Sequence, residues 1–107
     1  MSPAIAWVLP GLVAACSAIP TSNPYISLES TPVGAETRLT LFATPGARIN
    51  ARLKPALERK DGSVLRFEGA SVTTDSSYFT APPVLMVHGD ATGIVRASVC
   101  PEGENVC

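Results

Sequence analysis

Cysteines are the residues of this chain with the clearest chemistry, and two of the three lie close together near residue 107. Cys100 ends a β-branched, alternating stretch, and the polar segment Pro101-Glu102-Gly103-Glu104-Asn105-Val106 separates it from Cys107. A pair at this spacing can close a small disulfide loop or, where its sulfurs are accessible, exchange electrons with another thiol. The pair therefore predicts a disulfide in an oxidising compartment, and both uses remain open.

The sequence around this pair favours the structural use. A reactive cysteine needs an accessible sulfur whose thiolate is stabilised by a nearby cation. The loop instead contains Glu102 and Glu104, and no Lys, Arg or His lies between the two cysteines. We therefore expect a stabilising disulfide, with thiol–disulfide exchange as the alternative.

Other site chemistry has little support in the sequence. His88 is the only histidine, so a zinc site would lack convincing ligands. A catalytic triad would need His88 with Asp75 or Asp90, and no nucleophile motif surrounds any serine. The carboxylates on or near a predicted hairpin are typical of a solvated face: Glu58, Asp61 and Glu68. We expect no metal and no cofactor.

Composition is typical of a small exported β domain. The 107 residues allow one domain, and 10 prolines with 8 glycines favour many turns over long helices. Charged residues make up 16% of the chain, and its net charge is -1. Because the Lys and Arg residues are scattered, the sequence predicts no nucleic-acid partner.

The N-terminal segment predicts export and lipidation. An uncharged apolar run of about a dozen residues is too short to cross a bilayer as a helix and is typical of a signal peptide. It ends in Leu12-Val13-Ala14-Ala15-Cys16, which resembles a bacterial lipobox. The resemblance implies that Val13, Ala14 and Ala15 direct signal cleavage and that Cys16 is lipidated. A plain cleaved signal peptide and a buried apolar strand are the alternatives.

These assignments divide the chain into three parts. Residues 1–15 are expected to be a signal peptide, residues 16–24 the lipidated cysteine and a flexible polar tether, and residues 25–107 the folded domain. Assigning Cys16 to lipid leaves an even number of cysteines for a disulfide. We expect a membrane-anchored lipoprotein that faces the periplasm or the cell exterior.

Alternation of apolar and polar residues predicts short strands between turns rich in Pro and Gly. The expected strands cover residues 25–29, 38–43, 48–53, 84–88 and 94–100, with a hairpin over 55–68 turned by Asp61-Gly62. A helix over 51–60 competes, but Pro55 would cost about 3 kcal/mol inside it. Residues 71–80 are expected to form a loop or an edge strand. The pattern predicts an all-β fold, an antiparallel immunoglobulin-like β-sandwich of about seven short strands.

Two stretches resemble the N-terminal periplasmic domain of the DsbD thiol–disulfide interchange family. They are Pro45-Gly46-Ala47-Arg48-Ile49-Asn50 before an alternating hairpin, and Ala97-Ser98-Val99-Cys100 followed by Cys107. The resemblance implies an immunoglobulin-like sandwich whose cysteine pair passes electrons to periplasmic thioredoxin-fold proteins. In that family a further strand follows the second cysteine, so the resemblance predicts a sandwich that lacks its last strand here.

Two functions follow as hypotheses. The first is a cell-envelope lipoprotein module whose sandwich mediates binding or interaction and is stabilised by a Cys100–Cys107 disulfide. The second is a thiol–disulfide exchange domain, a protein oxidoreductase, in which Cys100 and Cys107 are catalytic. The acidic loop favours the first.

Overall fold

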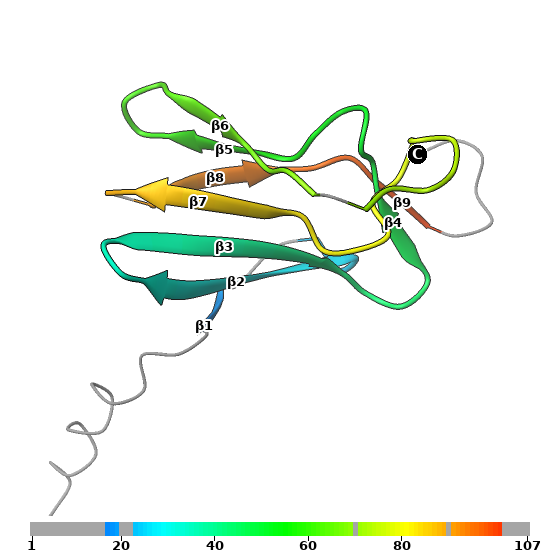
Figure 1. Cartoon of the computed structure of the whole chain (residues 1–107), viewed down its shortest axis with the longest axis horizontal. Coiled ribbons are helices and arrows are strands. Elements are labelled where there is room, and N and C mark those ends of the chain that lie inside the picture. The colour runs from blue at the N-terminus through cyan, green and yellow to red at the C-terminus, as the bar shows by residue number, and fades with distance from the viewer. Residues whose placement is uncertain (1–16, 20–22, 70, 90, 102–107) are drawn as a thin grey trace, which may run out of the picture.

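The structure is a computed structural model that describes residues 17–19, 23–69, 71–89 and 91–101. The described residues form nine strands and no helix (Figure 1). The strands are β1 (Ser17–Ile19), β2 (Ile26–Val33), β3 (Glu36–Ala43), β4 (Ala47–Ile49), β5 (Ala56–Arg59), β6 (Val64–Arg66), β7 (Val84–His88), β8 (Gly93–Arg96) and β9 (Val99–Pro101). All of their pairings are antiparallel, so the all-β antiparallel prediction is confirmed.

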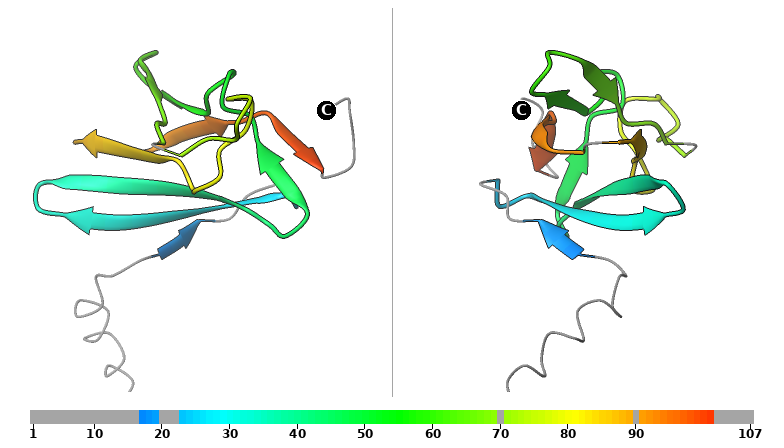
Figure 2. Two further views of the ribbon diagram at one scale, coloured as in Figure 1. Left: turned by 45° about the vertical axis from the view of Figure 1, so that its right-hand side comes forward. Right: turned by 90° about the vertical axis from the view of Figure 1, so that its left-hand side faces the viewer.

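The strands form a four-stranded sheet, β1-β2-β3-β7, a three-stranded sheet, β6-β5-β8, and a β4-β9 pair. Seen from the side, the two larger sheets form separate layers, with β4 and β9 at one end (Figure 2). One hydrophobic core joins them, and its buried members are Leu28, Leu39, Leu41, Ile49, Leu57, Phe67, Leu85 and Val87. This layering is consistent with the expected sandwich, and the immunoglobulin-like connectivity stays a prediction.

Alternation along β3 and β7 creates the buried face of the larger sheet. On β3, Leu39 and Leu41 point into the core and are buried. Arg38, which precedes Leu39, points to the opposite face and is exposed. On β7, Leu85 lies opposite Leu39 and is buried with Val87. Because successive side chains of a strand point to opposite faces, this apolar set could be predicted from the sequence.

The hairpin over residues 55–68 is also confirmed, with β5 and β6 as its two strands. Gly62 adopts a positive φ of 90° in the turn, a conformation that glycine enters without steric cost. Asp61 Oδ1 accepts hydrogen bonds from the backbone N–H and the hydroxyl of Ser63 at 2.8 and 2.6 Å. These bonds lower the pKa of Asp61 from its ordinary value, and the competing helix over 51–60 is absent.

β2, which corresponds to the strand predicted over residues 25–29, is longer than predicted. β2 was expected to end at Glu29 and instead continues to Val33, through Pro32. β1 pairs only with Leu28–Ser30, so within the described residues Pro32 has a strand partner on one side, β3. Proline is tolerated at such an edge position because no second ladder needs its missing N–H.

The predicted strand over residues 48–53 is wrong beyond Ile49. The side chain of Asn50 ends β4, because its Oδ1 accepts hydrogen bonds from the N–H groups of Arg52 and Leu53 at 2.7 and 2.8 Å. Asparagine competes with strand pairing through such local turns. Leu53 is consequently 66% exposed, whereas Ile49 is 3% exposed in the core.

The count of nine strands, against about seven predicted, has two sources. Ser17–Ile19 lies within the predicted flexible tether but pairs with β2 as β1. The single strand expected over residues 94–100 is divided into β8 and β9. The second difference decides the surroundings of Cys100.

Candidate functional site

Cys100 lies in the β4–β9 pair at one end of the domain. The register places Arg48 opposite Cys100 and Ile49 opposite Val99. The N–H of Asn50 extends this pairing by donating to the carbonyl of Ser98 at 2.8 Å. Cys100 is 1% exposed, so its sulfur belongs to the interior of the domain.

A break in the strand turns Cys100 inward. β8 ends at Arg96 and pairs with β5, whereas β9 begins at Val99 and pairs with β4. Regular pairing over residues 94–100 would place Cys100 on the same face as Arg96. Arg96 is exposed and Cys100 is buried, so the pairing is not regular across these residues. The chain changes sheets at Ala97 and Ser98.

Arg48 is a neighbour of Cys100 that could not be predicted from the sequence around the cysteines. Its Nη2 lies 3.8 Å from Cys100 Sγ, although the two residues are 52 positions apart. The expectation that no cation lies near the cysteine pair considered only sequence neighbours, and this contact corrects it. The only signal in the sequence was a basic residue in the alternating stretch after Pro45-Gly46.

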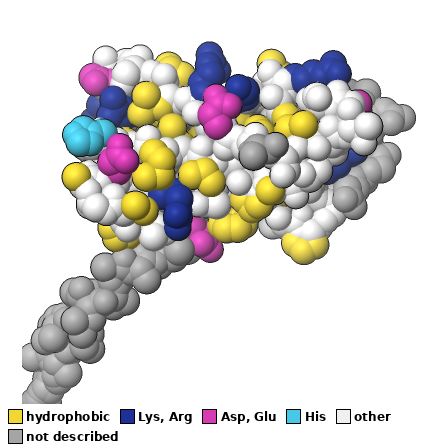
Figure 3. Space-filling view, in the orientation of Figure 1, with side chains coloured by type: hydrophobic (Ala, Val, Ile, Leu, Met, Phe, Trp, Pro, Cys, Tyr) yellow, Lys and Arg dark blue, Asp and Glu magenta, His cyan; other side chains and the backbone are white. Residues whose placement is uncertain are grey.

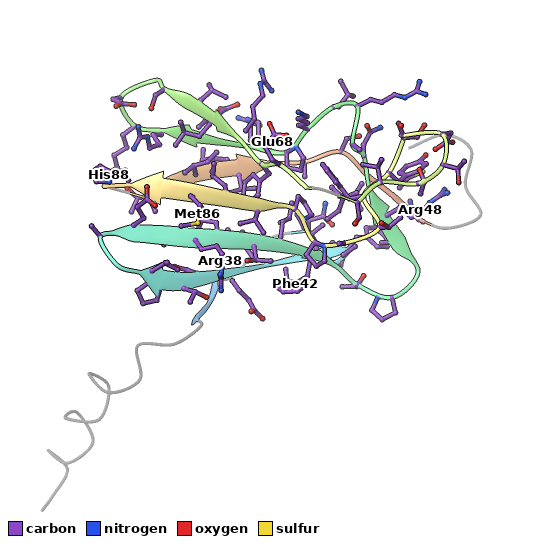
Figure 4. The ribbon with its side chains drawn as sticks, viewed as in Figure 1. Arg38, Phe42, Arg48, Glu68, Met86 and His88 are labelled. Atoms are coloured by element: carbon purple, nitrogen blue, oxygen red, sulfur yellow. The ribbon has the colours of Figure 1, made fainter. Side chains whose placement is uncertain are left out.

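Tyr78 also contacts the Arg48 guanidinium. Arg48 Cζ lies 4.2 Å from the centroid of the Tyr78 ring, within the range of a cation–π interaction. Figure 4 shows Arg48 on β4, near the end of the domain that also carries β9. The guanidinium thus contacts both an aromatic face and the sulfur of Cys100.

The segment that carries Tyr78 pairs with β4 on the side away from β9. The N–H of Phe79 donates to the Ile49 carbonyl at 3.0 Å, and the N–H of Ala51 donates to the Ser77 carbonyl at 2.8 Å. This partial pairing agrees with the predicted loop or edge strand over residues 71–80. β4 therefore lies between Cys100 and the aromatic segment and positions both.

A tight turn precedes Tyr78 and is held by Asp75. Asp75 Oδ1 accepts hydrogen bonds from the Thr73 hydroxyl at 2.6 Å and from the Ser77 N–H at 3.0 Å. These bonds lower the pKa of Asp75, the Thr73 hydroxyl most of all. The folded state therefore favours the carboxylate, and its contribution to the turn is lost as the pH falls through the lowered pKa.

Two open pockets flank Arg48. One, of about 310 Å³, is lined by Arg48, Thr73, Thr74, Asp75 and Tyr78. The other, of about 190 Å³, is lined by Phe42, Ala43, Ala47, Arg48, Ile49, Phe79, Thr80, Ala81 and Pro82. Arg48 is the residue that they share.

Burial and charge act in opposite directions on the chemistry of Cys100. A guanidinium beside a sulfur stabilises the thiolate that is released when a disulfide is reduced. Burial denies an incoming thiol access to the same sulfur. Cys100 is disulfide-bonded, and its partner is not among the described residues. The arrangement therefore suits a shielded disulfide better than an exposed nucleophile.

The other five predicted site residues lie outside the described part of the chain. They are the cleavage residues Val13, Ala14 and Ala15, the lipidation residue Cys16 and the second loop cysteine Cys107. Their predicted roles stay predictions. Of the predicted site residues, the structure places Cys100.

His88 and Asp75 are not brought together. His88 lies at the end of β7, opposite to the end that carries Arg48 (Figure 4). Its Nδ1 is 4.0 Å from Glu36 Oε2, and its side chain is 79% exposed. The triad of His88 with Asp75, which lacks a nucleophile motif in the sequence, is therefore not assembled, since Asp75 belongs to the turn beside Arg48.

Two of the three carboxylates on or near the hairpin form surface ion pairs, as is typical of a solvated face. Glu58 Oε2 lies 2.9 Å from Arg96 Nε, and Glu68 Oε1 lies 2.8 Å from Lys54 Nζ. Within the described ranges no three His, Cys, Asp or Glu side chains are grouped as metal ligands would be. The described residues also contain no helix long and apolar enough to span a membrane.

No family model, curated protein or solved structure matches the chain. The resemblance of the two stretches named above to the DsbD family stays a prediction.

Proposed function

We propose that this chain is an exported, lipid-anchored module of the cell envelope whose β domain mediates binding and is stabilised by a Cys100–Cys107 disulfide. The burial of Cys100 carries the structural half of the proposal, because a sulfur that is 1% exposed suits a permanent crosslink. β9, the strand that contains it, has three residues. A crosslink at this short strand would restrict the unfolded chain and secure the strand in the folded domain.

The outer face of the larger sheet supports the binding role. Met86 is 41% exposed and lies directly opposite Arg38 in the β3–β7 register. Phe42 follows on the same face of β3 (Figure 4). Figure 3 shows hydrophobic side chains gathered around a basic one on this face. Aromatic, Met and Arg side chains are enriched at protein interfaces, so the partner proposed for this face is another envelope protein.

The contact between Arg48 and Cys100 favours one second candidate, thiol–disulfide exchange. In such a reaction, a partner's thiolate attacks one sulfur of the disulfide, and the other sulfur leaves as a thiolate. Arg48 Nη2, 3.8 Å from the sulfur, would stabilise Cys100 as the leaving thiolate. Because Cys100 is also buried, the attack would fall on Cys107, and the partner would be a periplasmic thioredoxin-fold protein.

Replacing Cys16 with alanine is expected to abolish the membrane anchor, because the proposed acyl chains are attached at that sulfur. Cells that express Cys16→Ala and are fed a radiolabelled fatty acid should yield unlabelled protein in the soluble fraction. The matched control, Cys107→Ser, also removes one cysteine but should keep both the label and the membrane fraction. Label that persists in Cys16→Ala would refute the anchor.

A further inference from the structure

β1 begins at the residue that follows the proposed lipidation site. Ser17 is the first residue of β1, and it lies opposite Ser30 of β2. Consecutive Cα atoms of a trans peptide are about 3.8 Å apart, so Cys16 is covalently held within that distance of a residue paired to the sheet. The polar stretch expected to act as a tether is thus used in part for strand pairing.

The antiparallel pairing also defines the direction in which an anchor would leave the domain. Because β1 and β2 are antiparallel, the chain that precedes Ser17 leaves β1 in the direction in which β2 runs towards Val33 and the turn at Gly34. β2 continues beyond Ser30 to Val33, an advance of about 10 Å at about 3.4 Å per residue. The β2–β3 turn therefore projects past the first paired residue on the anchor's side.

That end of the domain is suited to contact with lipid headgroups. Val33 is 41% exposed, and the turn residues Gly34 and Ala35 are exposed and uncharged. The β5–β6 turn lies at the same end (Figure 1), and it presents the exposed Lys60 beside the exposed Asp61, a charge pair that can meet the phosphate and ammonium groups of zwitterionic lipids. Small and apolar groups at the tip lose little hydration when they enter the interface.

We infer that acyl chains on Cys16 hold the β2–β3 hairpin end of the domain directly against the bilayer, with Val33 and the adjoining turn at the headgroups. The inference rests on the proposed lipidation. It opposes the expectation of a domain held away from the surface by a flexible tether. The opposite end, with Cys100 and Arg48, would face the aqueous phase.

The chain offers a clean fluorescence probe for this orientation. Its single tryptophan, Trp7, lies in the predicted signal peptide, so the mature protein would contain none. Val33→Trp and Tyr25→Trp form a matched pair, because the native residues are 41% and 44% exposed. They are separated by about 27 Å along extended chain, given about 3.4 Å per residue.

The experiment uses the lipidated mature protein in phosphatidylcholine vesicles that contain brominated acyl chains, which quench tryptophan on contact. Val33→Trp should lose fluorescence and shift to shorter wavelength, whereas Tyr25→Trp should keep the emission measured in vesicles without bromine. Ala35→Trp, at the turn itself, repeats the test at a second exposed position. A flexible Gly-Ser spacer inserted between Cys16 and Ser17 should abolish the quenching but leave flotation with the vesicles unchanged.

The outcomes separate this inference from the proposal on which it rests. Protein that floats with the vesicles while Val33→Trp and Ala35→Trp stay unquenched would overturn the orientation and leave the anchor intact. Equal quenching of Tyr25→Trp would also overturn it, since the domain would then lie on its side. Protein from cells fed the fatty acid that fails to float with the vesicles would overturn the anchor, and the orientation with it.

Discussion

Replacing Phe67 with alanine is expected to lower the free energy of unfolding by about 3–5 kcal/mol. The side chain is 0% exposed and belongs to the core that joins the two larger sheets. Its N–H donates to the Pro55 carbonyl at 2.8 Å, and the next residue, Glu68, exchanges backbone hydrogen bonds with Val84 of the other sheet. Phe67 thus lies at the point where the layers meet, and neighbouring residues cannot easily collapse into the cavity that its loss would leave.

Chemical denaturation monitored by circular dichroism checks this prediction. Leu53→Ala is the matched control, because it also removes a large apolar side chain but one that is 66% exposed. Its effect should stay within about 0.5 kcal/mol. Similar losses for the two variants would contradict the shared core. A small domain has roughly 5–15 kcal/mol of net stability, so Phe67→Ala should also be visible as a large fall in Tm.

Loss of the disulfide at Cys100 is expected to lower the free energy of unfolding by about 2–4 kcal/mol, whether by reductant or by Cys100→Ala. Crosslinking restricts the unfolded chain, and Cys100 is also a well-packed residue at 1% exposure. Cys16→Ala keeps both sulfurs of the proposed pair and should unfold as the parent does. A parent protein whose denaturation is the same with and without reductant, or peptide mapping that joins Cys100 to Cys16, would contradict this account.

The strands that depend on local pattern could be predicted from the sequence. Alternation located β3, a continuous apolar run located β7, and Asp61-Gly62 located the β5–β6 turn. The errors came where tertiary pairing or a side chain decided the outcome. Asn50 captures two backbone N–H groups and ends β4, although the apolar alternation continues to Leu53.

The position of Cys100 at the end of a strand could be predicted from the sequence, but the residues that surround it could not. The end of a strand pattern identified Cys100, but its inward orientation depends on the change of sheet at Ala97 and Ser98. Arg48 reaches the sulfur from 52 positions earlier in the chain. Cross-strand register between distant segments is determined by packing of the whole fold. The carboxylates of the loop after Cys100 are therefore visible in the sequence, whereas the proximity of Arg48 is not.

The equilibrium reduction potential of the Cys100 disulfide in the intact protein tests the central claim most directly. A structural disulfide, shielded by burial, should have a potential below about -300 mV, beyond the reach of a glutathione buffer. Arg48 stabilises the reduced form and so raises the reduction potential. If the proposal holds, the effect of burial on the potential must be larger than the effect of Arg48. A potential between about -270 and -120 mV, the range that thiol–disulfide exchange proteins cover, would contradict the structural role and favour thiol–disulfide exchange.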